Sequence, residues 1–310
     1  MTNNPSDLQN RLLKLTNSVD DIAKDLRELL SDIKVAHAQQ TVSAQLAEIR
    51  TLVGPFGVPM PGERMLVQTI HGIKYLIDPH DLIMAPQLIV YRQWEPDLTQ
   101  YFLSAVDSTT VFVDVGANFG YFTCLAGARI GASGKGSVTS FEPNPKLFSL
   151  LRDNCAINWS MCGIQLHEMA LAENEGAFDL WVPNDRAANA SLTQLDGASP
   201  VAVKVKSLDS VLGNEAVVDI MKVDVEGHEA GVLRGARQVI ERSPNINIVL
   251  EWSVSQMREA NSEPEQMIDL FSELGLAAYQ IPRSREEDLV KYRDEELVST
   301  HYANLLLRHR

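Results

Sequence analysis

The segment MKVDVEGHEAGVLRGA, residues 221–236, contains the residue types best suited to chemistry. Lys222 and Asp224 are two positions apart, so in a strand both side chains would point to the same face. His228 follows in a Glu-Gly-His-Glu turn that leads into a predicted helix. A lysine and a carboxylate in a buried strand must pair with each other or lie at the strand's carboxyl end, where ligands bind. The segment therefore predicts a functional site, with a structural Lys222–Asp224 ion pair beside a solvated loop as the alternative.

A glycine turn earlier in the chain predicts a nucleotide site. In VFVDVGANFGYFT, residues 111–123, a strand carries Asp114, and Gly116 and Gly120 then open a helix. Glycine permits a tight turn with the backbone close to a ligand, but these two are four apart and do not form the G-x-G-x-x-G dinucleotide pattern. Glu142 ends the next predicted strand, where a carboxylate can accept hydrogen bonds from both ribose hydroxyls. We therefore expect a nucleoside ligand without a pyrophosphate.

Alternating strand and helix patterns from Val111 onward must position these residues. Apolar runs predict strands at residues 111–115, 137–142, 165–169, 217–223, 247–250, 277–281 and 302–307, with shorter ones at 176–182 and 201–205. Helical patterns lie between them, at residues 121–128, 146–158, 229–241 and 264–274. This order predicts an α/β fold, a mainly parallel sheet with helices on both faces.

Three segments of the chain resemble the FkbM family of S-adenosylmethionine-dependent methyltransferases. They are VFVDVGANFGYFT, SFEPNP and, above all, the Lys-x-Asp-Val-Glu-Gly-His-Glu string followed by Val-Leu-x-Gly-Ala at residues 222–236. The Trp-Glu-Pro trio at residues 94–96 also resembles the family's approach to its first strand. The resemblance covers about residues 90–307 and implies a class I, Rossmann-like methyltransferase fold with a seven-stranded, mostly parallel sheet whose last strand is antiparallel.

The resemblance also implies which residues bind S-adenosylmethionine. Its amino acid half would lie against the glycine turn, at Asp114, Gly116, Ala117, Asn118 and Gly120. Glu142 would bind the ribose. Asn144 and the neighbouring pair Met169 and Ala170 would lie beside the adenine.

Methyl transfer from a sulfonium to a hydroxyl group requires the alignment of oxygen, carbon and sulfur and the removal of the hydroxyl proton. We expect Asp224 or His228 to be the general base, with Lys222 orienting the hydroxyl group or lowering its pKa. The alternative is a divalent metal held by Asp224, His228 and Glu251, which would polarise the hydroxyl group as a Lewis acid.

The acceptor that the resemblance implies is a sugar hydroxyl of a polysaccharide or lipopolysaccharide type of glycan, and a small secondary metabolite is the alternative. An NAD-dependent oxidoreductase on a similar fold is disfavoured because the second pyrophosphate glycine is missing. A coiled-coil scaffold with an inactive methyltransferase domain is disfavoured by the intact Asp114, Glu142 and Asp224.

Composition divides the chain into three parts. None of the 18 glycines and none of the Phe, Trp or Tyr residues lies in residues 1–53. This segment carries a heptad repeat with a phase break at residues 37–41, so we predict a coiled-coil helix that forms a homodimer or homotrimer. Residues 54–110 contain a predicted hairpin and helices split near Pro96, and form either a lid over the site or a segment packed on the core. Residues 111–310 form the cofactor-binding domain.

The net charge, the cysteine count and the lengths of the apolar runs indicate which compartment and which partners to expect. The formal net charge of −14 disfavours nucleic acid as a partner. Three cysteines are too few for a disulfide framework and fit a reducing cytosol. No apolar run reaches the length of a transmembrane segment, and the N-terminus shows no signal-peptide core. We expect a cytoplasmic enzyme that its coiled coil holds near a glycan-synthesis assembly.

Overall fold

The structure, a computed structural model, describes Lys24 and residues 57–159, 161–183, 191–193, 198–282 and 287–310. The chain divides into two units, Met1–Gly54 and Pro55–Arg310. The coiled coil predicted at residues 1–53, and with it the predicted homo-oligomer, lies outside the described residues apart from Lys24. Within the described part of the chain, no helix has the length and apolar character that crossing a membrane requires.

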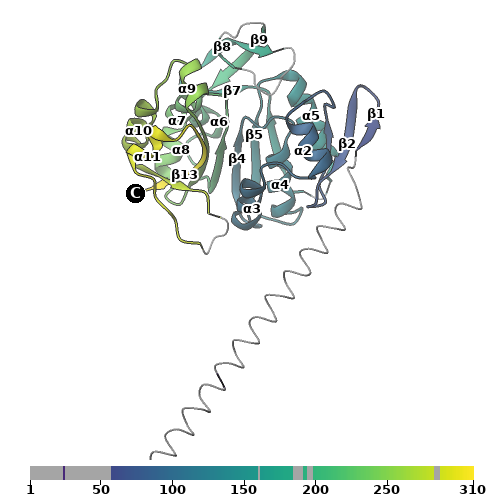
Figure 1. Cartoon of the computed structure of the whole chain (residues 1–310), viewed down its shortest axis with the longest axis horizontal. Coiled ribbons are helices and arrows are strands. Elements are labelled where there is room, and N and C mark those ends of the chain that lie inside the picture. The colour runs from purple at the N-terminus through teal and green to yellow at the C-terminus, as the bar shows by residue number, and fades with distance from the viewer. Residues whose placement is uncertain (1–23, 25–56, 160, 184–190, 194–197, 283–286) are drawn as a thin grey trace, which may run out of the picture. The chain divides into compact units, whose positions relative to one another are not determined.

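A seven-stranded sheet runs through the second unit (Figure 1). Its strands are β4 (Val111–Val115), β5 (Ser137–Phe141), β6 (Ile164–His167), β10 (Ile220–Val223), β11 (Asn247–Ser253), β12 (Leu276–Gln280) and β13 (Tyr302–His309). They lie in the order β12-β13-β11-β10-β4-β5-β6, with β13 antiparallel to both of its neighbours. This is the class I methyltransferase arrangement that the resemblance implied, so the predicted α/β fold class is confirmed for the described residues.

Helices cover both faces of the sheet, as the alternating pattern predicts. One face packs against α3 (Pro96–Ala105), α4 (Tyr121–Ile130) and α5 (Pro145–Ile157). The other packs against α6 (Leu208–Leu212), α7 (Glu229–Gly235), α8 (Arg237–Arg242), α10 (Pro264–Glu273) and α11 (Asp294–Ser299). Strand alternation sorts the side chains: Phe112 and Ile220 belong to the first core, and their neighbours Val113 and Met221 belong to the second.

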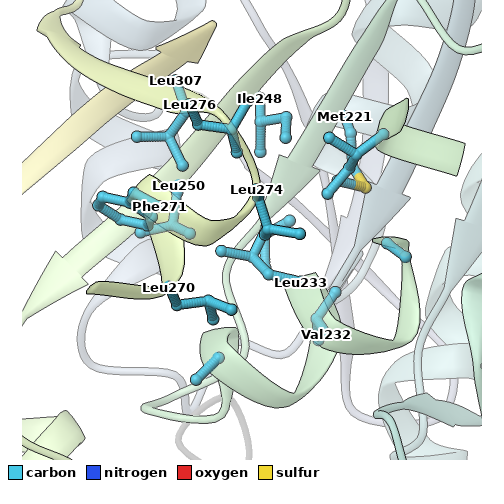
Figure 2. Packing of buried hydrophobic residues seen from close by; sticks show 14 of the residues in the cluster. Met221, Val232, Leu233, Ile248, Leu250, Leu270, Phe271, Leu274, Leu276 and Leu307 are labelled. Atoms are coloured by element: carbon cyan, nitrogen blue, oxygen red, sulfur yellow. The ribbon is translucent and has the colours of Figure 1, made fainter. Parts of the chain in front are cut away.

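The second core fixes the position of β10 in the sheet. Figure 2 shows Met221 of β10 and Ile248 of β11 in one cluster with apolar side chains of α7 and of the end of α10, among them Leu233 and, directly after α10, Leu274. All of these side chains are buried. Burying a Leu, Ile or Met side chain stabilises the fold by about 1.5–3 kcal/mol relative to leaving it exposed. A well-packed core therefore holds the carboxyl end of β10, which contains the residues predicted to take part in catalysis.

The middle segment forms the predicted hairpin and helices. Three short strands, β1 (Val58–Met60), β2 (Arg64–Gln68) and β3 (Lys74–Ile77), pair in antiparallel order, and α2 (Met84–Val90) follows. The amide of Asn154 on α5 bonds both backbone groups of Leu76, accepting at 2.6 Å and donating at 3.0 Å. The Tyr75 hydroxyl donates to the Tyr121 carbonyl at 2.8 Å. The segment is thus tied to α4 and α5, beside the carboxyl ends of the strands.

The shorter strands predicted at residues 176–182 and 201–205 are confirmed as β8 (Gly176–Pro183) and β9 (Ala198–Lys206). With β7 (Ala170–Leu171) they form a separate sheet in the order β7-β9-β8, seen at the top of Figure 1. One predicted helix is corrected by the structure. The helix predicted at residues 229–241 is two helices, α7 and α8. At the end of α7, a Cβ on Gly235 would lie 2.5 Å from the Ala172 carbonyl oxygen, so the chain passes too close to β7 for any other residue there. The sequence pattern also missed α9 (Val254–Glu259).

Candidate active site

A cavity of about 300 Å³ lies at the carboxyl ends of β4, β5, β10 and β11. Ten predicted site residues line it: Gly116, Ala117, Asn118, Glu142, Met169, Ala170, Lys222, Asp224, His228 and Glu251. The middle segment adds Ile83 and Met84 where α2 begins, and Trp94 and Glu95 before α3. The two motifs that the sequence analysis singled out therefore share one cavity.

Gly116 forms the turn between β4 and the rest of the cavity wall. Its φ of +77° lies in the left-handed region, and a Cβ there would lie 1.8 Å from the Asp224 carbonyl oxygen. The backbone N–H groups of Gly116 and Ala117 both donate to the Phe141 carbonyl at 3.0 Å. Only glycine fits this position, because any side chain would clash with the backbone at Asp224.

Glu142 lies at the floor of the cavity and is 6% exposed. Its Oε2 accepts from the Asn118 N–H at 2.7 Å, and its Oε1 accepts from the Asn144 N–H at 2.9 Å. Burial raises the pKa of Glu142 to about 7, although these backbone donors and Lys222 oppose the rise. Each carboxylate oxygen retains a further lone pair for a ribose hydroxyl. The glycine cradle and the fixed carboxylate thus fit S-adenosylmethionine.

Lys222 is a buried cation at the end of β10. Its Nζ lies 3.1 Å from Oδ2 of Asp224 and 3.7 Å from Oδ1 of Asp114, and it donates to the Gly116 carbonyl at 3.2 Å. The ring of Phe122 lies beneath it, 5.6 Å from Nζ. Burial alone would lower the pKa of Lys222, but the two carboxylates outweigh burial and raise it. The lysine is therefore charged and holds Asp224 at the edge of the cavity.

Three predicted cofactor residues do not line the cavity. Asp114 is fully buried in β4, where its Oδ2 accepts from the Thr123 hydroxyl at 2.6 Å. Gly120 begins α4 with a φ of +94°, and a Cβ there would lie 2.5 Å from Leu151. The Asn144 side chain caps α5. The structure gives these residues supporting positions, because each fixes a neighbouring element whose other residues reach the cavity.

His228 precedes α7 and reaches the cavity from the Glu-Gly-His-Glu turn. Its Nε2 lies 3.1 Å from the Ser191 hydroxyl and 3.4 Å from the Thr193 hydroxyl. Burial lowers the pKa of His228, so the imidazole is neutral near pH 7. Sequence reasoning did not find the two hydroxyl partners, because they come from the segment after β8, which no local pattern connects to His228.

Glu251 enters the cavity from β11. Its Oε2 is buried and has no hydrogen-bond partner among the described residues. Burial first, and then the charges of Asp224, Glu226 and Glu229, raise the pKa of Glu251 to about 10, while a hydrogen bond from Tyr302 opposes the rise. Tyr302 begins the antiparallel strand β13 and was not predicted as a site residue.

Glu95 is the acidic residue that sequence reasoning left out of the site. It precedes α3 with a φ of +39°, a left-handed conformation that is strained for glutamate. Its Oε1 is 3.4 Å from the Asn304 amide of β13. Burial, and then the charge of Asp224, raise the pKa of Glu95 to about 7. The Trp-Glu-Pro trio is the signal that could have found it.

The metal alternative is not supported by the arrangement of these side chains. Among the described residues, no three His, Cys, Asp or Glu side chains are placed to hold a metal ion together. Asp224, His228 and Glu251 all line the cavity, but they do not form a ready set of ligands. Asp224 is instead paired with Lys222.

Comparisons with known proteins identify methyltransferases that are similar to this chain. The family described as Methyltransferase FkbM domain matches residues 114–276. The hexuronic acid methyltransferase AglP of Haloferax volcanii is 27% identical over 198 residues, which cover 63% of this chain and 75% of that protein. Methyltransferase sdnD of Sordaria araneosa is 26% identical over 191 residues, 51% of this chain and 72% of that protein. Among solved structures, M. jannaschii TYW2 in complex with AdoMet has a TM-score of 0.42 and 13% identity, over 81% of this chain and 86% of that chain.

Proposed function

The chain belongs to the FkbM methyltransferase domain family, and from its site we propose that it methylates a hydroxyl group of a sugar in a glycan. Membership of the family makes it an S-adenosylmethionine-dependent methyltransferase. The observation that carries the finer proposal is that one cavity joins the glycine turn and Glu142 to Lys222, Asp224 and His228. A sugar acceptor is supported by the similarity to a protein named as a hexuronic acid methyltransferase.

One end of the cavity suits the cofactor. Gly116, Ala117 and Asn118 would hold its amino acid half, and Glu142 would accept hydrogen bonds from its ribose hydroxyls. Met169 and Ala170 would pack against its adenine. When bound, S-adenosylmethionine supplies a methyl group whose bond to a positively charged sulfur breaks as the bond to the acceptor oxygen forms, with the electron pair remaining on sulfur.

The other end of the cavity suits a hydroxyl group. Asp224 accepts a hydrogen bond from it and so aims the oxygen, and Lys222 holds Asp224 in place at 3.1 Å. The Asp224 carboxylate is already engaged by the Lys222 ammonium. The neutral imidazole of His228 is the better proton acceptor. Ser191 and Thr193 hold its Nε2, which leaves Nδ1 to receive the hydroxyl proton.

The decisive experiment is a transfer assay with S-adenosylmethionine labelled in its methyl group. We would offer a panel of neutral and uronic acid oligosaccharides beside small non-sugar alcohols. We expect label in a sugar as a methyl ether that survives mild alkali, which a methyl ester does not. Transfer to a non-sugar alcohol alone would favour the secondary-metabolite alternative, and an alkali-labile product would contradict the assignment to a hydroxyl group.

A further inference from the structure

The acceptor end of the cavity carries more negative than positive side chains. Lys222 is the one lysine or arginine among the described residues that line the cavity. Its ammonium is already in contact with Asp224 and with the buried Asp114. Glu95 and Glu251 line the same end, and no described lysine or arginine pairs with either. Glu226 also lines the cavity, so the carboxyl groups there outnumber the one ammonium group, and neither Glu95 nor Glu251 has a salt bridge of its own to a described cation.

The fold places the backbone of both Glu95 and Glu251 at the cavity wall. Glu95 is fixed by the strained backbone before α3, and its neighbour Pro96 is the first residue of that helix. Glu251 is held in the ladder between β11 and β13, opposite Asn304, and its Oε2 is buried without a hydrogen-bond partner. Desolvation of an acidic group is costly unless a cation or donors compensate it. This arrangement fits a cationic ligand.

The cofactor of the proposed reaction is such a cationic ligand. The cofactor carries a positive charge on sulfur, and the methyl group lies between that sulfur and the acceptor oxygen. If the oxygen is held at Asp224, the sulfur lies within a few bond lengths of the same end of the cavity. After transfer the sulfur is neutral, and the positive charge has left with the proton of the hydroxyl group.

We propose that Glu95 is the counter-charge of the cofactor's sulfonium, and that it makes the cavity bind S-adenosylmethionine more tightly than the product S-adenosylhomocysteine. The proposal rests on the acceptor end assigned under the proposed function, but not on the identity of the acceptor. The pKa of Glu95, which is raised in the absence of a cation, agrees with it. Methyl transfer therefore lowers the affinity of the cavity for the cofactor, because the product S-adenosylhomocysteine has no charge on its sulfur.

The size of the effect follows from simple electrostatics. Two unit charges about 6 Å apart at an effective dielectric constant near 20 interact strongly enough to change an equilibrium about 100-fold at most. Partial protonation of Glu95 and residual solvent reduce this, so we expect on the order of tenfold for Glu95. The comparison needs no acceptor, because both ligands bind to the enzyme alone.

The experiment is calorimetric titration of the full chain with three ligands at pH 7.5. They are S-adenosylmethionine, S-adenosylhomocysteine and sinefungin, in which a protonated amine replaces the methylsulfonium group. We expect the wild type to bind both cationic ligands at least tenfold more tightly than S-adenosylhomocysteine. Glu95→Gln should lower that preference several-fold, whereas Glu251→Gln should change it little, because burial raises the pKa of Glu251 to about 10 and the group is neutral at pH 7.5. Both variants should leave the affinity for S-adenosylhomocysteine nearly unchanged, which also shows that they are folded.

Asp97→Asn is the matched control, because Asp97 is exposed in the first turn of α3 and does not line the cavity. It changes the net charge by the same amount as Glu95→Gln and should leave the preference intact. Equal affinity of the wild type for all three ligands, or a preference that survives Glu95→Gln, would overturn the proposal. Failure of sugar methylation with the preference intact would contradict the proposed acceptor alone.

Discussion

The ammonium of Lys222 on β10 lies 3.7 Å from Oδ1 of Asp114, its register partner on the neighbouring strand β4. Both side chains are buried, and the same ammonium reaches Asp224 at 3.1 Å. One charged group thus links the strand that begins the cofactor turn to the loop that we propose aims the acceptor. Lys222 therefore forms the structural ion pair with Asp224 that the sequence analysis gave as an alternative, and it also lines the proposed active site.

Removing this cation should destabilise the fold. Lys222→Met leaves Asp114 buried without a cation, and breaking a buried pair in this way costs about 3–5 kcal/mol. Urea denaturation would measure the loss. Lys206→Met is the control, because Lys206 pairs with Glu175 on the surface at 2.7 Å and such pairs contribute about 1 kcal/mol or less. A loss of under 1 kcal/mol for both variants would contradict a strong buried link.

The glycine turn should tolerate no side chain. Gly116→Ala places a Cβ against the Asp224 carbonyl oxygen, so the turn must move, and we expect affinity for S-adenosylhomocysteine to fall at least 100-fold in calorimetry. Gly213→Ala is the matched control: its φ is +71°, but a Cβ there meets nothing within 4 Å. That variant should cost about 1 kcal/mol of stability and leave binding unchanged. Equal binding losses would mean that backbone strain alone, and not the contact with Asp224, sets the requirement for glycine.

Glu95 should make the stability of the ligand-free protein depend on pH. Its pKa is raised from 4.5 to about 7, so between these values the folded chain retains a proton that the unfolded chain releases. Stability from this group is therefore greatest below pH 4.5, falls as the pH rises through about 7, and is constant above. Glu95→Gln should remove about 1–3 kcal/mol of the difference in unfolding free energy between pH 5 and pH 8. Asp97→Asn should leave that difference unchanged, and a steeper decline in Glu95→Gln would show that the sign is wrong.

His228 should matter for turnover and not for cofactor binding. We expect His228→Gln to lower kcat by 10²–10⁴-fold on whichever acceptor the transfer assay identifies, as for the loss of a general base. S-adenosylhomocysteine affinity should stay within a few-fold of the wild type. His309→Gln is a suitable control, because the Nε2 of His309 contacts the Ile240 carbonyl at 3.0 Å and lies outside the cavity lining. If kcat is retained in His228→Gln, the base is Asp224 or another group.

Local sequence determined most of the elements and the two halves of the site. Strand alternation placed Lys222 and Asp224 on one face, and the requirement for glycine at 116 followed from the turn that must leave β4. Glu142 could be located because the carboxyl ends of parallel strands meet at one edge of a sheet. These conclusions depend on periods of two to four residues and on the chemistry of single side chains, which the sequence displays directly.

Only the tertiary structure decided which distant segments complete the cavity. Glu95 precedes the first strand of the sheet, and Tyr302 lies on the strand inserted between β11 and β12, yet both line the same cavity as Asp224. The same packing kept Asp114 in the core, although its place in the glycine motif suggested the cofactor. Strand order and helix packing depend on the burial of many apolar side chains together. Because this burial is cooperative and involves the whole chain, no local sequence pattern can assign a single acidic residue such as Glu95 to the site.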